Sequence, residues 1–325
     1  MTHVLETRPL GRTGLELTRI GLGCGSFGGI GSAPQFFGQG ESQDEAFALL
    51  DTAFELGVNF VDTADAYGGG RSESWIGAWL RAQRRHMLLS TKVFHSVHGD
   101  PADHGLAHGR ILRQFDGSLE RLGVGRVDMY LVHAPDPEAP LEETLSALDE
   151  LVRAGKVGAI GACNVDRAWL EQALAISERE GFARVEWVQN SYSLLDRAAD
   201  SEILPYCAEH GLGFTPYSPL AGGWLTGKYR HGEPAAAGSR MTMRPEPYVH
   251  LDDDAVYRGL DRLDEAAAER GVDMPTLAFA WLLSHPQVTA VIAGPRRPEQ
   301  LEPARRALEV ELSPAERDDL ASLFP

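Results

Sequence analysis

The chain has 325 residues, of which 43% are hydrophobic and 24% charged, values typical of a globular protein with a substantial core. Its formal net charge of −17 excludes nucleic acid as an expected partner, because a field of that sign repels polyanions. The three cysteines, Cys24, Cys163 and Cys207, form no C-x-x-C spacing, which argues against a disulfide framework or a zinc site and fits a reducing cytoplasm. No signal-like or membrane-spanning apolar run occurs, so we expect a cytoplasmic protein without a membrane partner.

The chain alternates between short apolar strands and amphipathic helices after an expected hairpin over residues 4–18. The expected strands, each with its following helix, are 18–25 with 42–57, 59–64 with 72–83, 87–93 with 107–123, 127–134 with 140–155, 157–164 with 166–181, 185–192 with 201–211, 212–219 with 255–271 and 274–285, and 288–294 with 297–309, before a last helix at 313–323. Eight such units predict an α/β protein with a closed (β/α)8 TIM barrel, formed by residues 1–325 as one domain. The structural alternative is an open doubly wound sheet.

An open sheet would need a phosphate-binding fingerprint on its first strand. Gly23, Gly25 and Gly28 match G-x-G-x-x-G, but that motif must open a helix at once, and here a glycine-rich stretch runs on to Glu41. We therefore interpret these glycines as a turn that lets a ligand approach. The one irregular insertion, residues 221–251, follows the seventh strand and should lie on the same barrel rim as the other strand-to-helix loops.

Polar residues stand at the carboxyl ends of three consecutive expected strands. Asp62 ends the second with Tyr67 just beyond, Lys92 ends the third, and His133 ends the fourth. Taken singly, such a lysine is usually solvated and such a histidine is usually structural. In a barrel, however, these ends meet on one rim, where burying a lysine and an aspartate is costly unless they pair. Their convergence predicts a site.

The four residues form a plausible acid catalyst. Asp62 is expected to pair with Lys92, and the Lys92 charge to lower the pKa of Tyr67. Tyr67 can then give its proton to a carbonyl oxygen that His133 orients by a hydrogen bond. Such acid catalysis has no covalent nucleophile, so the hydride must come from another molecule.

In these four residues the chain resembles the aldo-keto reductases, because they match the catalytic tetrad of that family. The supporting motifs cover almost the whole chain: NFVDTADAYG, LLSTKV, LVHAPDP, GKVGAIGACN, VQNSY, YSPLAGGWLTGKY and IAGPRRPEQLE. These motifs are most similar to those of the aflatoxin-aldehyde reductase and general bacterial oxidoreductase branches of the family. The resemblance implies reversible, NADPH-dependent reduction of a small-molecule aldehyde or ketone to the alcohol, with a tyrosine as general acid.

The resemblance also implies which residues bind the cofactor. Those carried over are Cys163, Asn164 and Gln189 for the carboxamide, Tyr217 to stack on the nicotinamide, Ser218, Pro219, Leu220, Gly222 and Lys228 for the pyrophosphate, and Gly294, Arg296, Arg297 and Gln300 for the adenosine end. Two adjacent arginines at a helix start suit a 2′-phosphate and favour NADPH over NADH. The chain departs from the family at Cys163, usually serine, and at Pro303 and Ala304, where Glu-Asn is common, so contacts there are in doubt.

Substrate residues are less defined. Phe27, Phe94 and Trp224 are candidates for walls of the substrate pocket, with ordinary packing as the alternative. His95, His98, His104 and His108 crowd into the loop after the third strand, but their irregular spacing matches no metal motif, so we expect no metal and a solvated loop that faces the substrate.

Two other functions stay open. One is an NADP-binding regulatory subunit with little turnover, a role that some members of the resembled family have. The other is a Schiff-base aldolase-type barrel that uses Lys92 as nucleophile. Asp62 argues against the second, because an ion pair keeps the lysine protonated. The sequence leaves open the natural substrate, the direction of reaction in the cell and the oligomeric state.

Overall fold

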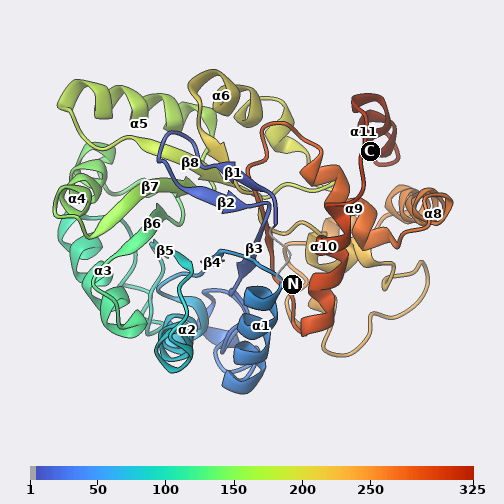
Figure 1. Cartoon of the computed structure of the whole chain (residues 1–325), viewed down its shortest axis with the longest axis horizontal. Helices are drawn as coiled ribbons and strands as arrows, with labels where there is room; N and C mark the ends of the chain where they lie inside the picture. Colours follow the sequence, from blue (N-terminus) through green and yellow to red (C-terminus); the bar gives the residue numbers. More distant parts are fainter. Residues whose placement is uncertain (1–4) are drawn as a thin grey trace.

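A computed structural model describes residues 5–325 and forms a (β/α)8 barrel, as the strand–helix alternation predicts (Figure 1). The eight parallel strands run in the order β10–β3–β4–β5–β6–β7–β8–β9. Their bounds are β3 (Ile20–Gly23), β4 (Phe60–Asp62), β5 (Leu88–Val93), β6 (Val127–Val132), β7 (Val157–Cys163), β8 (Val185–Gln189), β9 (Gly213–Phe214) and β10 (Val291–Ala293). Backbone hydrogen bonds from Thr289 N to Phe214 O (2.8 Å) and from Ile292 N to Pro216 O (3.0 Å) join the two ends of this row.

Helices surround the strands, and several begin where a side chain caps the first turn (Figure 1). Their bounds are α1 (Gln43–Glu55), α2 (Arg71–Gln83), α3 (His108–Leu122), α4 (Leu141–Arg153), α5 (Arg167–Glu180), α6 (Ile203–His210), α7 (Arg240–Met243), α8 (Asp254–Glu269), α9 (Met274–Leu283), α10 (Glu302–Ala307) and α11 (Pro314–Ala321). Ser42 closes a reciprocal capping box with Glu45, and Asp166 and Asp273 cap α5 and α9. Throughout residues 5–325, each helix is too short or too polar to cross a membrane.

Three segments differ from the sequence expectation. The seventh strand is only two residues long, because Pro216 and a left-handed Ser218 (φ 55°) turn the backbone out of the sheet. The expected helix at 297–309 starts as a 3₁₀ turn over Pro298–Leu301 before α10. The insertion over 221–251 holds two 3₁₀ turns and α7. Met1–Val4, including the first residue of the expected hairpin, lie outside the described residues.

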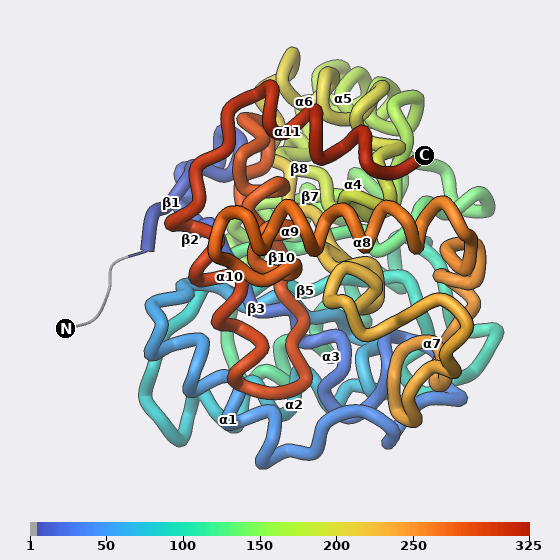
Figure 2. The backbone as a smooth tube through the Cα atoms, turned by 90° about the vertical axis from the view of Figure 1, so that its right-hand side faces the viewer, coloured from blue at the N-terminus to red at the C-terminus, as the bar shows by residue number. Residues whose placement is uncertain are grey.

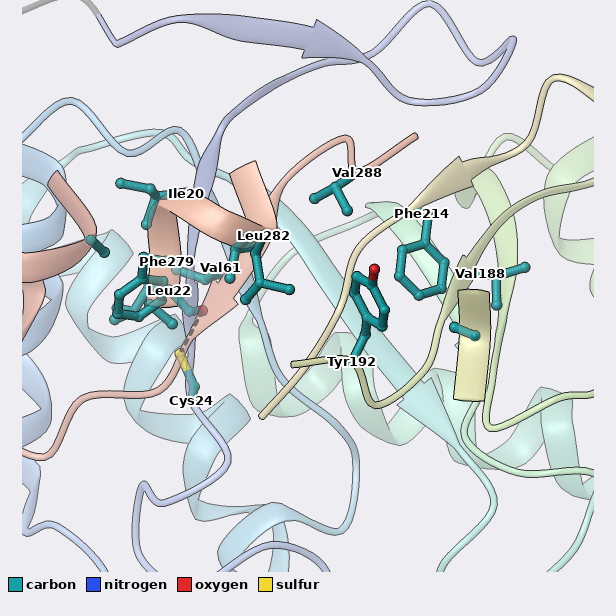
Figure 3. Packing of buried hydrophobic residues seen from close by; sticks show 14 of the residues in the cluster. Ile20, Leu22, Cys24, Val61, Val188, Tyr192, Phe214, Phe279, Leu282 and Val288 are labelled. Atoms are coloured by element: carbon teal, nitrogen blue, oxygen red, sulfur yellow. Dashed lines mark hydrogen bonds between the residues drawn. The ribbon is translucent and has the colours of Figure 1, made fainter. Parts of the chain in front are cut away.

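Side chains alternate between two cores along each strand. The outer cluster fills the space between strands and helices and includes Val61, Leu89 and Tyr130; Figure 3 shows Leu22 and Val61 beside Phe279 of α9. The inner cluster fills the barrel and lies near the amino ends of the strands. Its buried members are Leu10, Leu17, Phe60, Met129, Leu131, Ala159, Trp187, Ala290 and Ile292. The barrel is thus a packed core at one end, which leaves the carboxyl ends of the strands for a site.

An antiparallel hairpin, β1 (Thr7–Pro9) and β2 (Glu16–Thr18), closes the amino end of the barrel. It is drawn across the barrel opening in Figure 1. Leu10 and Leu17 belong to the inner cluster and are fully buried. The hairpin therefore serves as a hydrophobic plug, and the opposite end of the barrel is the open one.

Gly21 gives a test of the packing inside the barrel. A Cβ at this position would lie 2.0 Å from Cζ of Phe60, so Gly21→Ala should lower the free energy of unfolding by roughly 1–3 kcal/mol, the usual cost of overpacking. Gly109, in α3, has open space around it, so Gly109→Ala is the matched control and should be neutral or stabilising by about 0.5–1 kcal/mol. Urea unfolding followed by circular dichroism measures both; equal midpoints would contradict the packing described.

Candidate active site

The inner face of the barrel changes from apolar to polar toward the carboxyl ends of the strands. On β4 the inward Phe60 is followed two residues later by Asp62, and on β5 the inward Leu88 is followed by Ser90 and Lys92. Asp62 lies opposite Ser90 in the strand register. The two-residue period of a strand thus brings these polar side chains to one place at the rim.

Lys92 and Asp62 form a buried ion pair. The Lys92 Nζ donates to Asp62 Oδ2 at 2.6 Å and to the backbone oxygen of Thr63 at 2.8 Å, and the lysine side chain is 0% exposed. The second oxygen of Asp62, Oδ1, accepts from Ser90 Oγ and from Gln189 Nε2, both at 3.0 Å. Every strong polar group of the pair is therefore satisfied, which is the condition for burying two charges.

Tyr67 and His133 stand beside this pair. Tyr67 begins a 3₁₀ turn over Tyr67–Gly70, and its hydroxyl lies 3.4 Å from Nε2 of His133, with either atom as donor. The Lys92 Nζ lies 5.0 Å from the centre of the Tyr67 ring. Asp62, Tyr67, Lys92 and His133 are therefore brought together as the strand ends predict, with the phenol and the imidazole aimed at the same space.

The environment sets the protonation of each group. Burial alone lowers the pKa of Lys92, but the charge of Asp62 and the neighbouring Tyr67 raise it above its ordinary value, so the lysine is a cation. Burial lowers the pKa of His133 well below its ordinary value, with Lys92 and His95 adding to the effect, so the imidazole is neutral at pH 7.

The expectation that the pKa of Tyr67 lies below its ordinary value is wrong. Burial raises this pKa to about 12, and the charge of Lys92, which acts to lower it, is the weaker effect. Tyr67 therefore keeps its proton at pH 7. The cation at Lys92 offsets part of the desolvation cost of a phenolate, so that the phenol remains able to give up its proton to a ligand.

A second group of polar side chains continues around the rim from β7 and β8. Asn164, which has a left-handed φ of 59°, donates from Nδ2 to the backbone oxygen of His133 (2.9 Å) and accepts from the Tyr217 hydroxyl (2.6 Å). Cys163 is buried, and its thiol lies 3.6 Å from Oε1 of Gln189. Burial raises the pKa of Cys163 to about 12, so the thiol is neutral. Gln189 thereby links Cys163 to Asp62.

The backbone after β9 is strongly curved. Ser218, Ala221, Gly222 and Gly223 all have positive φ angles (55°, 46°, 65° and 96°). A Cβ on Gly223 would lie 2.2 Å from Nζ of Lys228, so the lysine ammonium rests directly on this turn. A turn of successive left-handed residues with a cation on it is a suitable place for an anionic group. Pro219 and Leu220 lie within the same turn.

The candidate adenosine residues lie after β10. Gln300 Oε1 accepts from the backbone N–H groups of Arg296 (2.8 Å) and Arg297 (3.2 Å), which fixes the start of the 3₁₀ turn. Arg297 pairs with Glu299 in solvent at 3.0 Å. Arg296 instead pairs with Glu41, a residue from the loop after β3, at 2.8 Å. Gly294 precedes this turn, and Pro303 and Ala304 lie in α10.

The three candidate substrate-wall residues differ in exposure. Phe27 and Trp224 are fully buried in the outer core, with 0% and 1% exposure, so packing is the role that the structure displays for them. Phe94 is half-buried next to the rings of His95 and His104. A Cβ on Gly25 would lie 3.5 Å from Cε2 of Tyr67, an ordinary van der Waals contact, so the loop after β3 passes directly beside this ring.

Arg110 holds the histidine-rich loop in place. Arg110, 6% exposed, donates to the backbone oxygens of His95, Asp103 and Gly105 and to the Asp103 carboxylate. His95 lies with its ring 4.9 Å from that of His133, and burial lowers its pKa to about 4. Among residues 5–325 no group of three or more His, Cys, Asp or Glu side chains is arranged to hold a metal ion.

The chain is similar to known proteins over almost its whole length. The Aldo/keto reductase family profile matches residues 19–324. The uncharacterized oxidoreductase YrpG of Bacillus subtilis is 35% identical over 99% of this chain and 96% of its own length. A probable voltage-gated potassium channel subunit beta of Oryza sativa is 34% identical, over 94% and 92%. The NADH-specific methylglyoxal reductase of Escherichia coli is 31% identical, over 95% of each chain.

Tyr67→Phe should separate proton donation from cofactor binding. Removal of one hydroxyl deletes the proton donor but no charge, so we expect kcat for reduction of a carbonyl to fall by at least about 100-fold, the usual scale for a general acid. The dissociation constant for NADPH, from quenching of protein fluorescence, should change by less than about threefold. Parallel loss of binding would refute a role in proton donation.

Lys92→Met should impair both turnover and stability. It leaves Asp62 buried without its partner, which typically costs about 3–5 kcal/mol. The control is the double variant Asp62→Asn with Lys92→Met, in which no charge is left unpaired. We expect chemical unfolding to show recovered stability for the double variant, while kcat stays low. If turnover recovers together with stability, Lys92 acts through the fold alone.

Proposed function

The chain belongs to the aldo/keto reductase family, and from this premise we propose that it reduces an aldehyde or ketone to the alcohol with NADPH, using Tyr67 as proton donor. It is an oxidoreductase that acts on small carbonyl compounds with a nicotinamide cofactor. The observation that carries the assignment of roles is the buried Lys92–Asp62 pair beside the Tyr67 hydroxyl and His133 Nε2, which lie 3.4 Å apart. A carbonyl oxygen placed within reach of both atoms meets two hydrogen-bonding groups at once.

The residues divide the work as follows. A neutral His133 donates a hydrogen bond from Nε2 to the carbonyl oxygen and so fixes its position. As the oxygen gains negative charge, the Tyr67 hydroxyl delivers its proton to it, and the nearby Lys92 cation stabilises the phenolate that remains. Asp62 holds the cation in place. The reduced nicotinamide, when bound, supplies the hydride to the carbonyl carbon. In the reverse direction, the phenolate accepts the alcohol proton.

The residues present fit such a cofactor. The Tyr217 ring stands at the rim with its hydroxyl fixed by Asn164, which gives a flat apolar face for a nicotinamide ring. The left-handed turn at Ser218–Gly223 with Lys228 on it suits a pyrophosphate. Arg296 and Arg297 supply positive charge for a 2′-phosphate, which is the basis for preferring NADPH.

A regulatory role is the second candidate, because similar chains in this comparison are named as potassium channel beta subunits. Such a subunit would bind the nucleotide but turn over slowly. A Schiff-base mechanism has less support, because Lys92 is held as a cation by two acceptors and a cationic amine is not a nucleophile.

The deciding experiment combines binding with turnover. Fluorescence titration with NADPH and NADH should give saturable binding of both, and a panel of small aldehydes and ketones should show NADPH oxidation at 340 nm. Binding without turnover across the panel would favour the regulatory role. Absence of nucleotide binding would overturn both candidates.

The joint variant Arg296→Ala with Arg297→Ala tests how the phosphate is recognised. Loss of two cationic donors should weaken NADPH binding by about three- to tenfold while NADH changes little, since both arginines already share their charge with a carboxylate and their side chains are 48% and 70% exposed. The ratio of the two dissociation constants should move toward one. An unchanged ratio would place recognition of the 2′-phosphate elsewhere.

A further inference from the structure

The two adjacent arginines after β10 are 48% and 70% exposed and each pairs with a glutamate, but the two glutamates differ in burial. Arg297 pairs with Glu299, and both side chains are about two-thirds exposed (70% and 67%). Arg296 pairs with Glu41, whose side chain is only 2% exposed. An exposed pair is weakened by water and salt, whereas a buried carboxylate keeps most of its field. The two arginines are therefore unequal as binders of a phosphate.

Glu41 is fixed in place by its own backbone. Its N–H donates to Ser26 O and its carbonyl accepts from Gly28 N, so that the end of the β3–α1 loop folds back on the loop's beginning. Its Oε1 accepts from Arg296 Nε, while its Oε2 is buried and has no hydrogen-bond partner among residues 5–325. A buried carboxylate with one unsatisfied oxygen depends on its single cationic partner.

Arg296 forms hydrogen bonds to more than one segment of the chain. Besides the bond to Glu41, its Nη1 donates to Gly238 O at 2.8 Å, in the insertion that carries α7. Figure 2 shows α7 next to the blue loop that follows β3, and Arg244 Nη1 reaches Ile30 O across the same junction. Of the three guanidinium nitrogens of Arg296, only Nη2 has no hydrogen-bond partner within the described part of the chain. Arg296 can thus offer one free donor to a ligand while its charge is largely balanced by Glu41.

We propose that Glu41 is a specificity-determining residue that limits the preference for NADPH over NADH. The proposal rests on the proposed function. A 2′-phosphate at Arg296 brings about two negative charges close to a buried carboxylate, and Arg296 can offer it more than the free Nη2 only by breaking its bond to Glu41 or to Gly238. The 2′-hydroxyl of NADH is uncharged and meets neither cost. Juxtaposed like charges are a known means of weakening one ligand relative to another.

Glu41→Gln removes the charge and keeps the shape. We expect it to strengthen NADPH binding so that the ratio of the NADH to the NADPH dissociation constant rises about tenfold, with NADH itself changed by less than about threefold. Titration with 2′,5′-ADP, measured by calorimetry, should show the same gain without any nicotinamide present. Glu299→Gln is the matched control on the neighbouring arginine and should leave the ratio within about threefold, because its pair is exposed.

The wild-type protein provides a measurement that needs no variant. With Glu41 in place, its own preference for NADPH should stay below about tenfold; a preference above about 100-fold would overturn the inference. A ratio that is unchanged or lower in a folded Glu41→Gln protein would also overturn it, since Glu41 would then merely position Arg296. If the wild type binds neither nucleotide, the proposed function fails before this question arises.

Discussion

The site depends on one buried ion pair, Lys92 with Asp62. A lysine with no exposed surface is among the most costly groups to place inside a protein, and it is tolerated here because three further polar groups bond to the pair. Ser90 and Gln189 donate hydrogen bonds to the second oxygen of Asp62, and Thr63 O accepts a second hydrogen bond from the lysine. This network joins the ends of strands β4, β5 and β8 across the rim. The same desolvation that makes the pair costly keeps Tyr67 protonated and His133 neutral.

Much of this could be predicted from the sequence, because strand periodicity and chain order carry the necessary information. Asp62, Lys92 and His133 lie at the ends of three strands, and parallel strands in a barrel end on one rim, so their convergence follows from topology alone. Ser90 was missed, although it lies two residues before Lys92 on the same face of β5, which is the signal that would have found it. The net shift of the Tyr67 pKa was missed because the degree of burial is a property of packing, which a linear pattern does not contain.

Long-range contacts in loops were beyond prediction for a different reason. Glu41 and Arg296 are separated by 255 positions, and neither lies in a periodic segment that would orient its side chain. Arg110 likewise holds the histidine-rich loop mainly through three backbone oxygens, and a backbone oxygen is present at every residue, so the residue types of the loop do not indicate these bonds. Phe27 and Trp224 follow strands that end at the rim, yet their side chains are buried in the core. The position of a helix or strand residue follows from the local pattern, whereas the position of a loop residue depends on its contacts with distant segments.

The hairpin plug has a consequence for how the chain reaches its native state. Leu10 and Leu17 are synthesised first, but their inner-cluster neighbours include Ile292, near the carboxyl end. Arg19 similarly donates to Leu283 O and Thr289 O, more than 260 positions away. The amino-terminal segment therefore has no complete binding surface until nearly all of the chain has left the ribosome. Contacts of such sequence separation form slowly because loop closure must precede them, so we expect the barrel to close late in folding, with both ends of the chain taking part.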